Sequence, residues 1–492
     1  MAIQFFNTLS GKKEPFKSLQ NGKVTMYCCG VTPYGNTHIG HSRTFFSYDL
    51  LYRTLKDQGN EVDWARNITD VDDKIINKAN SENISCSQLV SRYVSEQNEM
   101  LELFNLLRPM HEPKVTETIP QIITLIEKLI EKQFAYVSQS GVYYRVRKFE
   151  EYGKLSKNKI NDLKAGARIE VDETKEDALD FALWKFAKAG EVFWSSPWGD
   201  GRPGWHVECS AMIHSLFGDS IDIHMGGRDL IFPHHEAEIA QSEAASGKPL
   251  ASTWLHAGMV TLYGEKMSKS TNHLVAIKDF LAKYPSEVLR LVFLSVSYSQ
   301  TLDFTFELAT ENLKKLAKIY RFVSLVNSYA EQSNLISAQK EFDGLIFADL
   351  SNLTTKMKEF LADDLNSNGA MATFFDFIKN VNIQLGKLEK SGQKLREEDI
   401  LLLKTKWPEF KNWLKTTLGI LIDEPKVFFE NLRNYNLGTE ISVEDIELKI
   451  QERTKARADK DWAKSDAIRD ELLAQGVQIQ DAPAGTKWTV VI

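Results

Sequence analysis

Residues 32–43 have the sequence Thr32-Pro33-Tyr34-Gly35-Asn36-Thr37-His38-Ile39-Gly40-His41-Ser42-Arg43. The β-branched and aromatic residues at 23–30 predict a strand before this stretch, and the apolar spacing over 43–55 predicts a helix after it. A strand-to-helix junction offers unpaired N–H groups and the positive end of a helix dipole, which suit a phosphate. Gly40 permits close approach, and both histidines can donate hydrogen bonds to phosphate oxygens. The alternative is two ordinary surface histidines at a helix start.

The chain on either side of this junction predicts a parallel sheet. A second strand is expected over 61–69, with a helix opening at 70–76, and strand–helix–strand–helix order favours a parallel α/β sheet with helices on its faces. The sheet is expected to resume over 220–225, with a helix from about Pro233 and a strand over 254–260. Ligands of such sheets gather at the carboxyl ends of strands, where Gly30 and Thr69 are expected.

Composition indicates an ordinary soluble protein. The chain has 492 residues, 43% hydrophobic and 26% charged, which is enough for three or more domains. No apolar run approaches the roughly 18 residues that span a bilayer, the first residues lack signal-peptide character, and four scattered cysteines are too few for a disulfide framework. We therefore expect a cytoplasmic protein with no membrane partner, and a monomer because no heptad run is present. The net charge of −7 means that any RNA contact must come from local basic surface.

A second charged motif lies far along the chain, at Lys266-Met267-Ser268-Lys269-Ser270. Two lysines and two serines in a polar loop can follow a triphosphate through reaction, although such a loop can also be merely solvated. Together with the histidine pair, it resembles the signature pair of class I aminoacyl-tRNA synthetases. That resemblance implies that the two motifs bind ATP from opposite sides and stabilise the charge that leaves with pyrophosphate. It gives catalytic roles to His38, His41, Lys266 and Lys269, and further ATP contacts to Gly40, Met267, Ser268 and Ser270.

A metal site is also possible. His234 and Glu238 are four residues apart, so they lie on one helical face, and an imidazole and a carboxylate at that spacing can hold one metal. Cys29 and Cys209 could add two thiolates, and two sulfur, one nitrogen and one oxygen ligand favour Zn²⁺. Buried structural cysteines and an acid-rich helix N-terminus are the alternatives.

Four segments together resemble the cysteinyl-tRNA synthetase family: Cys29-Gly30 before the histidine pair, 204–211, 232–238 and 266–270. The resemblance runs essentially the whole length and includes Asp363-Asp364-Leu365-Asn366 and 460–463. It implies that Cys29, Cys209, His234 and Glu238 bind one zinc ion. One departure is Cys28, where the family usually has an aliphatic residue. Adjacent strand side chains point to opposite faces, so we expect Cys28 to be a small buried hydrophobe. We assign no role to Cys86.

The implied function is ligation of L-cysteine to tRNA(Cys) in two steps through cysteinyl-adenylate, using ATP with Mg²⁺. Serine differs from cysteine only by oxygen for sulfur, and a thiolate is a far better zinc ligand than a hydroxyl, so zinc gives a physical route to specificity. Gly30, Thr69, Trp205 and His224 are expected to contact the substrate. Rival hypotheses are a ligase that passes activated cysteine to a small amine and a catalytically silent tRNA-binding relative.

The implied architecture is a Rossmann-like catalytic domain with a connective insertion, followed by helical tRNA-binding domains and a small C-terminal domain. The expected boundaries are 1–110 and 206–288 for the two catalytic halves, 111–205 for the insertion, 289–330 for stem-contact helices, 331–432 for a helical anticodon-binding domain and 439–492 for the terminal domain. Lys314, Lys318 and Arg321 share one face of a predicted helix. That face can contact RNA backbone or be merely solvated.

Overall fold

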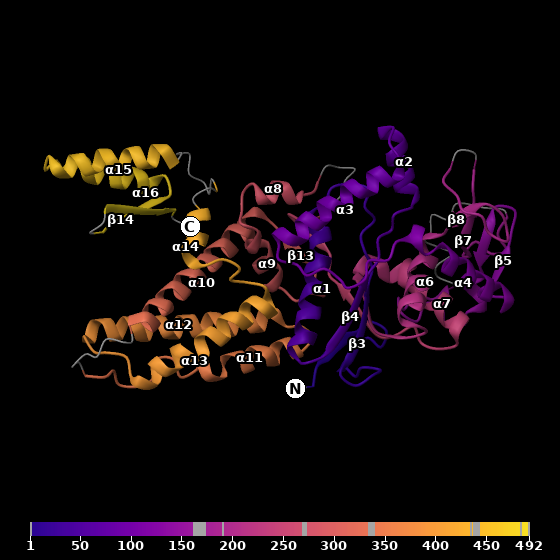
Figure 1. The fold of residues 1–492 in the computed structure, drawn as a ribbon, viewed down its shortest axis with the longest axis horizontal. Helices are drawn as coiled ribbons and strands as arrows, with labels where there is room; N and C mark the ends of the chain where they lie inside the picture. The colour runs from indigo at the N-terminus through magenta and orange to yellow at the C-terminus, as the bar shows by residue number, and fades with distance from the viewer. Residues whose placement is uncertain are drawn as a thin grey trace. The chain divides into compact units, whose positions relative to one another are not determined.

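The computed structural model describes residues 2–160, 174–188, 191–267, 273–332, 340–432, 435, 443–482 and 485–490. It has two compact units, one made of residues 1–261, 297–302 and 359–366, and the other of 262–296, 303–358 and 367–492. Figure 1 shows strands concentrated in the first part of the chain and helices in the later part. The predicted α/β class is confirmed. Among the described helices, none has both the length and the apolar character needed to cross a membrane.

A four-stranded parallel sheet forms the centre of the first unit. Its order is β10 (Ala251–Ala257), β9 (Ile221–Gly227), β3 (Lys23–Cys28) and β4 (Glu61–Arg66). The chain passes from β3 through α1 (Ile39–Asp57) to β4 on one side, whereas β9 and β10 lie on the other side. The connections therefore diverge between β3 and β9, and such a switch point leaves a ligand-binding crevice at the carboxyl ends of the strands.

Two further sheets and several helices complete this unit. β1 (Gln4–Asn7) and β2 (Lys12–Pro15) form a hairpin, and a four-stranded antiparallel sheet has the order β5-β6-β7-β8. The remaining elements have the bounds β5 Ala135–Val137, β6 Gly141–Tyr144, β7 Phe181–Phe186, β8 Gly201–Pro203, α2 Asp73–Glu82, α3 Cys86–Leu103, α4 Ile119–Glu131, α6 Trp205–Phe217 and α7 Glu236–Ser246. One continuous core joins the parallel sheet to α4, α6, α7 and the antiparallel sheet.

Helices dominate the second unit, after a small sheet of β11 (Val260–Leu262), β12 (Glu265–Lys266) and β13 (Leu302–Phe304). The long helix α10 (Phe306–Gln332) packs against its neighbours, and Tyr320 stacks on Phe428 with ring centroids 3.9 Å apart. The other helices are α8 Ile277–Leu281, α9 Ser286–Leu294, α11 Leu350–Ala362, α12 Ser367–Ser391, α13 Glu397–Trp413, α14 Pro425–Leu432, α15 Val443–Ala458 and α16 Trp462–Ala474.

The tail has a small core of its own, in which α15 and α16 pack on the antiparallel hairpin of β14 (Val477–Ala482) and β15 (Gly485–Val490). The two helices are separate elements, because α15 ends at Ala458 and α16 begins at Trp462. Lys460 in the gap has φ +60°, a left-handed conformation that no helix continues through.

Candidate active site and metal centre

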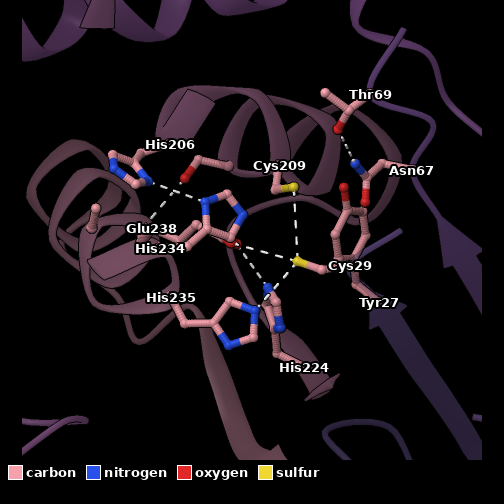
Figure 2. A network of polar contacts seen from close by, with 12 residues as sticks. Tyr27, Cys29, Asn67, Thr69, His206, Cys209, His224, His234, His235 and Glu238 are labelled. Atoms are coloured by element: carbon pink, nitrogen blue, oxygen red, sulfur yellow. Dashed lines mark hydrogen bonds and ion pairs between the residues drawn. The ribbon is translucent and has the colours of Figure 1, made fainter. Parts of the chain in front are cut away.

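The four predicted metal ligands lie together in the structure (Figure 2). Cys29 follows β3, Cys209 lies in α6, His234 lies in the helical turn Ile231–His235, and Glu238 lies in the first turn of α7. Their ligand atoms are all within 4.8 Å of one another, and all four side chains are buried. The i,i+4 spacing brings His234 Nε2 to 2.9 Å from Glu238 Oε1, as the sequence predicts. The helical turn Ile231–His235, in which Phe232 is non-helical, runs directly into α7, which agrees with a helix from about Pro233.

This donor set fits a zinc ion. Four ligands at about 2.0–2.3 Å in a tetrahedron stand roughly 3.3–3.8 Å from one another. The Sγ atoms of Cys29 and Cys209 are 3.9 Å apart, and Cys29 Sγ is 3.7 Å from Glu238 Oε1. Two soft sulfur donors with one nitrogen and one oxygen are also the ligand chemistry that zinc accepts.

The fold places Cys29 at the switch point of the parallel sheet. The Cys29 N–H donates to the Met225 carbonyl of β9 at 3.0 Å, and the Cys29 carbonyl accepts from the Tyr48 hydroxyl of α1 at 2.8 Å. The loop after β3 is therefore held by a neighbouring strand and by the helix that follows it. Cys28, the last residue of β3, is fully buried, which confirms the prediction of a small buried hydrophobe.

A second layer of histidines surrounds the four ligands. His224 Nε2 lies 2.7 Å from Glu238 Oε2, and His235 Nε2 lies 3.3 Å from Cys29 Sγ. Cys29, His224, His235 and Glu238 consequently form an alternative ligand group. Sequence reasoning expected His224 at the substrate and did not single out His235, although it is adjacent to His234 in the quoted motif. The structure places His224 against Glu238 and stacks its ring on Trp254 at 4.4 Å.

Burial and neighbouring charges shift the pKa values of the four ligands in different directions. The hydrogen bond from Cys29 lowers the pKa of the Cys209 thiol to about 6, whereas burial raises the pKa of Cys29. Burial alone lowers the pKa of His234, but Glu238 and Cys209 outweigh burial and raise it to about 10. Burial raises the pKa of a carboxyl group, but His224 and His234 hold the pKa of Glu238 well below its usual range. Without metal, the set thus holds a thiolate, an imidazolium and a carboxylate, and metal binding must release protons.

Gly30 and Thr69 lie at the ends of neighbouring strands, as predicted. The Gly30 N–H donates to Asn67 Oδ1 at 2.8 Å, and Asn67 Nδ2 donates to Thr69 Oγ1 at 3.1 Å. A Cβ atom at Gly30 would stand 2.0 Å from the Asn67 carbonyl oxygen, so only glycine fits here. Sequence reasoning missed Asn67, and its position two residues before Thr69 is the only signal that the sequence offers.

Trp205 lies between the four candidate ligands and a cavity that it helps to line. Its ring stacks on the His234 ring with centroids 4.4 Å apart, and 40% of the residue is exposed. The cavity has a volume of about 370 Å³ and is lined by Trp205, His206, Glu208, Arg202 and Asp73, among others. The ion pairs of Asp73 with Lys185 and Arg202 hold α2 against β7 and β8 at this cavity. Thr69 and His224 do not line it.

The histidine pair lies at the predicted junction. His38 is the N-cap residue of α1, His41 lies in the first turn, and their rings stack with centroids 3.6 Å apart. His38, Gly40 and His41 are each partly exposed. The N-terminal N–H groups of a 19-residue helix and two imidazoles thus face the same region, an arrangement suited to phosphate.

The lysine motif is described only at its beginning. Lys266 ends β12 and is exposed, and Met267 follows it. Ser268, Lys269 and Ser270 lie outside the described residues. Lys266 belongs to the second unit, whereas the histidines belong to the first.

A protein family, curated relatives and solved structures each match this chain. A family profile for the tRNA synthetases class I (C) catalytic domain matches residues 15–314. Similar curated proteins include the Cysteine--tRNA ligases of Geotalea uraniireducens (44% identical) and Geobacter metallireducens (43% identical), each covering 100% of both chains. A solved structure of methionyl-tRNA synthetase from Mycobacterium tuberculosis with methionyl-adenylate has a TM-score of 0.59 at 14% identity, covers 84% of this chain and 91% of that one, and shows the shared fold. The chain therefore belongs to the class I tRNA synthetases, in the family of the cysteine--tRNA ligases.

Proposed function

We propose that this chain ligates L-cysteine to tRNA(Cys) in two steps. The cysteine carboxylate attacks the α-phosphate of ATP, which gives cysteinyl-adenylate and pyrophosphate. A ribose hydroxyl of the tRNA then attacks the carbonyl carbon of the adenylate, forming the cysteinyl ester as the acyl–phosphate bond breaks and AMP leaves. The observation that carries the proposal is the buried cluster of Cys29, Cys209, His234 and Glu238 at the switch point of a class I sheet. The segment 29–41 connects this cluster to the histidine pair at the start of α1. One loop would therefore contact both the cysteinyl end and the phosphate end of an aminoacyl-adenylate.

The proposed metal is one Zn²⁺ per chain, held by Cys29, Cys209, His234 and Glu238. When bound, zinc would supply a soft Lewis-acid site for the thiolate of cysteine and only a weak one for the hydroxyl of serine. His224 and His235 would hold Glu238 and Cys29 in place. Magnesium would enter with ATP.

The remaining roles follow from position and charge. His38 and His41 would donate to the phosphates, with the backbone at Gly40, and Lys266 and Lys269 would neutralise the charge that develops on pyrophosphate. Met267, Ser268 and Ser270 would complete the ATP contacts of the lysine loop. Gly30, Thr69 and Trp205 would line the amino-acid side. His224, proposed from sequence as a substrate contact, serves better as a partner of Glu238.

For the partner, we propose tRNA(Cys) gripped by the helical region and the tail. The boundaries proposed from sequence remain 289–330 for stem contact, 331–432 for the anticodon helices and 439–492 for the terminal domain. Lys314, Lys318 and Arg321 are exposed along α10, which supports a contact with RNA backbone. We also propose a cytoplasmic monomer.

Two alternatives are weaker. A ligase for a small amine has no use for the helical region, which here aligns over its full length with the curated relatives. A silent relative has no use for an intact ligand set and histidine pair.

The deciding experiment is cysteine-dependent ATP–pyrophosphate exchange on protein assayed for zinc, with serine in parallel, followed by charging of tRNA(Cys). Exchange with cysteine alone, at one zinc per chain, together with charging, supports the proposal. Folded, zinc-loaded protein without exchange would favour the silent relative. Exchange without charging would favour the small-amine ligase.

A further inference from the structure

The segment Asp363-Asp364-Leu365-Asn366 has no role in the chemistry above. It belongs to the unit of the parallel sheet, although the residues before 359 and after 366 belong to the other unit. Asp364 and Leu365 both have positive φ values, +60° and +52°, and the Leu365 side chain is fully buried. Consecutive left-handed residues other than glycine persist only where the surroundings enforce them.

What holds the segment is the strand β1. The Asp364 N–H donates to the Gln4 carbonyl at 2.9 Å, and Asp364 Oδ1 accepts from the Phe6 N–H at 2.9 Å and from the buried Tyr298 hydroxyl at 3.2 Å. The side chain of neighbouring Asp363 makes an exposed ion pair with Lys13 at 2.8 Å. One carboxylate oxygen therefore anchors β1 at Phe6, and the Asp364 backbone anchors it at Gln4.

The other end of β1 is attached to β10. Asn7 Oδ1 accepts from the Trp254 N–H at 3.0 Å, and the Thr8 N–H donates to the Trp254 carbonyl at 2.9 Å. Thr8 Oγ1 lies 2.8 Å from His256 Nδ1. β1 and the residue after it thus join Asp364 to the backbone of Trp254 and to the side chain of His256 in β10.

The side chains of Trp254 and His256 contact the two histidines that lie next to the candidate ligands. His256 Nε2 lies 2.9 Å from His235 Nδ1, and His235 contacts Cys29. Trp254 stacks on His224, which contacts Glu238. From Asp364 to the two ligands, the contacts between segments are hydrogen bonds and one stacked ring pair, and the backbone of residues 4–8 and of Trp254 connects them.

We propose that Asp364 is a positioning residue for the cysteine site, which it aligns by anchoring β1 and, through β1, the histidines behind Cys29 and Glu238. The inference rests on the proposed function for its substrate and on the ligand set for its metal.

Three variants separate the parts of this role. Asp364→Gly removes the acceptor but tolerates the left-handed backbone. Asp364→Asn keeps an oxygen acceptor and also tolerates that backbone, so it is the conservative rescue. Asp363→Asn is the matched control, because it changes only the exposed neighbour.

Two readouts are needed on the full zinc-loaded chain: the KM values for cysteine and ATP in pyrophosphate exchange, and the rate of zinc release to a chromogenic chelator. Asp364→Gly loses two hydrogen bonds to Oδ1, of which only the one from Phe6 reaches β1. For this variant we expect the cysteine KM and the zinc-release rate each to rise about fivefold, the effect of losing the bond to β1, with the ATP KM within about twofold. Asp364→Asn and Asp363→Asn should stay within about twofold in all three.

Unchanged cysteine KM and zinc release in folded Asp364→Gly would overturn the inference, as would an equal rise in the KM values of cysteine and ATP. If that variant does not fold, Tyr298→Phe, which removes one donor to the same oxygen, is judged by the same criteria. If the unaltered chain shows no cysteine-dependent exchange, the proposed function fails, and zinc release alone still decides the positioning role.

Discussion

Replacing Gly30 by alanine tests whether stability and cysteine binding depend on the close contact between the loop after β3 and the loop after β4. A Cβ at this position would lie 2.0 Å from the Asn67 carbonyl oxygen and 3.1 Å from its carbon, both of them backbone atoms. Ordinary contact begins at 3.4 Å, so the two loops must separate by about 1.4 Å. That shift also breaks the 2.8 Å bond from Gly30 N–H to Asn67 Oδ1.

The cost follows from these two effects. Forced repacking of a tight contact costs about 1–3 kcal/mol, and loss of one hydrogen bond costs about 1 kcal/mol. We therefore expect Gly30→Ala to lose about 2–4 kcal/mol, or roughly 3–7 °C in the melting temperature of the first unit. Because Gly30 adjoins Cys29 and Asn67 holds Thr69, the cysteine KM should rise more than the ATP KM.

Calorimetry and pyrophosphate exchange measure these two quantities. The matched control is Gly386→Ala in α12, where an added Cβ meets no atom within 4 Å and a helical alanine should be neutral or stabilising by up to about 1 kcal/mol. If Gly30→Ala melted with the control and kept its cysteine KM, the close approach of these loops would not matter, and the reasoning would be refuted.

Three other perturbations test separate parts of the site. Cys209→Ser should lose bound zinc and the preference for cysteine over serine, measured by metal analysis and by exchange with each amino acid; a retained preference would contradict recognition through the metal. Lys269→Ala should depress adenylate formation far more than cysteine binding, and equal losses would remove its role in charge stabilisation. Burial, with neighbouring positive charges, lowers the pKa of His206 and of His256 to about 3 from an ordinary 6.5. Between about pH 6.5 and 3 the unfolded chain therefore binds protons at these histidines that the folded chain does not bind. The metal-free protein should lose stability as the pH falls from 6.5 towards 3. A stability–pH curve that is flat over that range would contradict neutral buried histidines.

The fold could be predicted from sequence wherever local patterns were strong. The period of Ile119 to Ile130 corresponds to α4, and the junction at His38 corresponds to the start of α1. Sequence reasoning missed α3, although Leu89, Val90 and Tyr93 form its buried face, because charged and amide residues interrupt that pattern. The expected strand over 254–260 proved to be the end of β10 and the beginning of β11, since the edges of strands depend on partners that the sequence does not name.

The candidate site was likewise predictable only in part. Residue types and a family resemblance were enough to select Cys29, Cys209, His234 and Glu238, which the fold brings together. The supporting groups were not predictable, because Asn67, His235 and His256 act through contacts between distant segments. A histidine at the end of a strand gives no signal of its own until its neighbour in space is known.

The helix α1 begins beside the histidine pair, with His38 at its N-cap and His41 in its first turn, and its Tyr48 hydroxyl donates to the carbonyl of Cys29. In the proposed reaction, α1 therefore fixes the distance between the groups at the phosphate end and those at the sulfur end of the substrate. A fixed distance favours one side-chain length, whereas sulfur chemistry alone does not: homocysteine also offers a thiolate but is longer by one methylene.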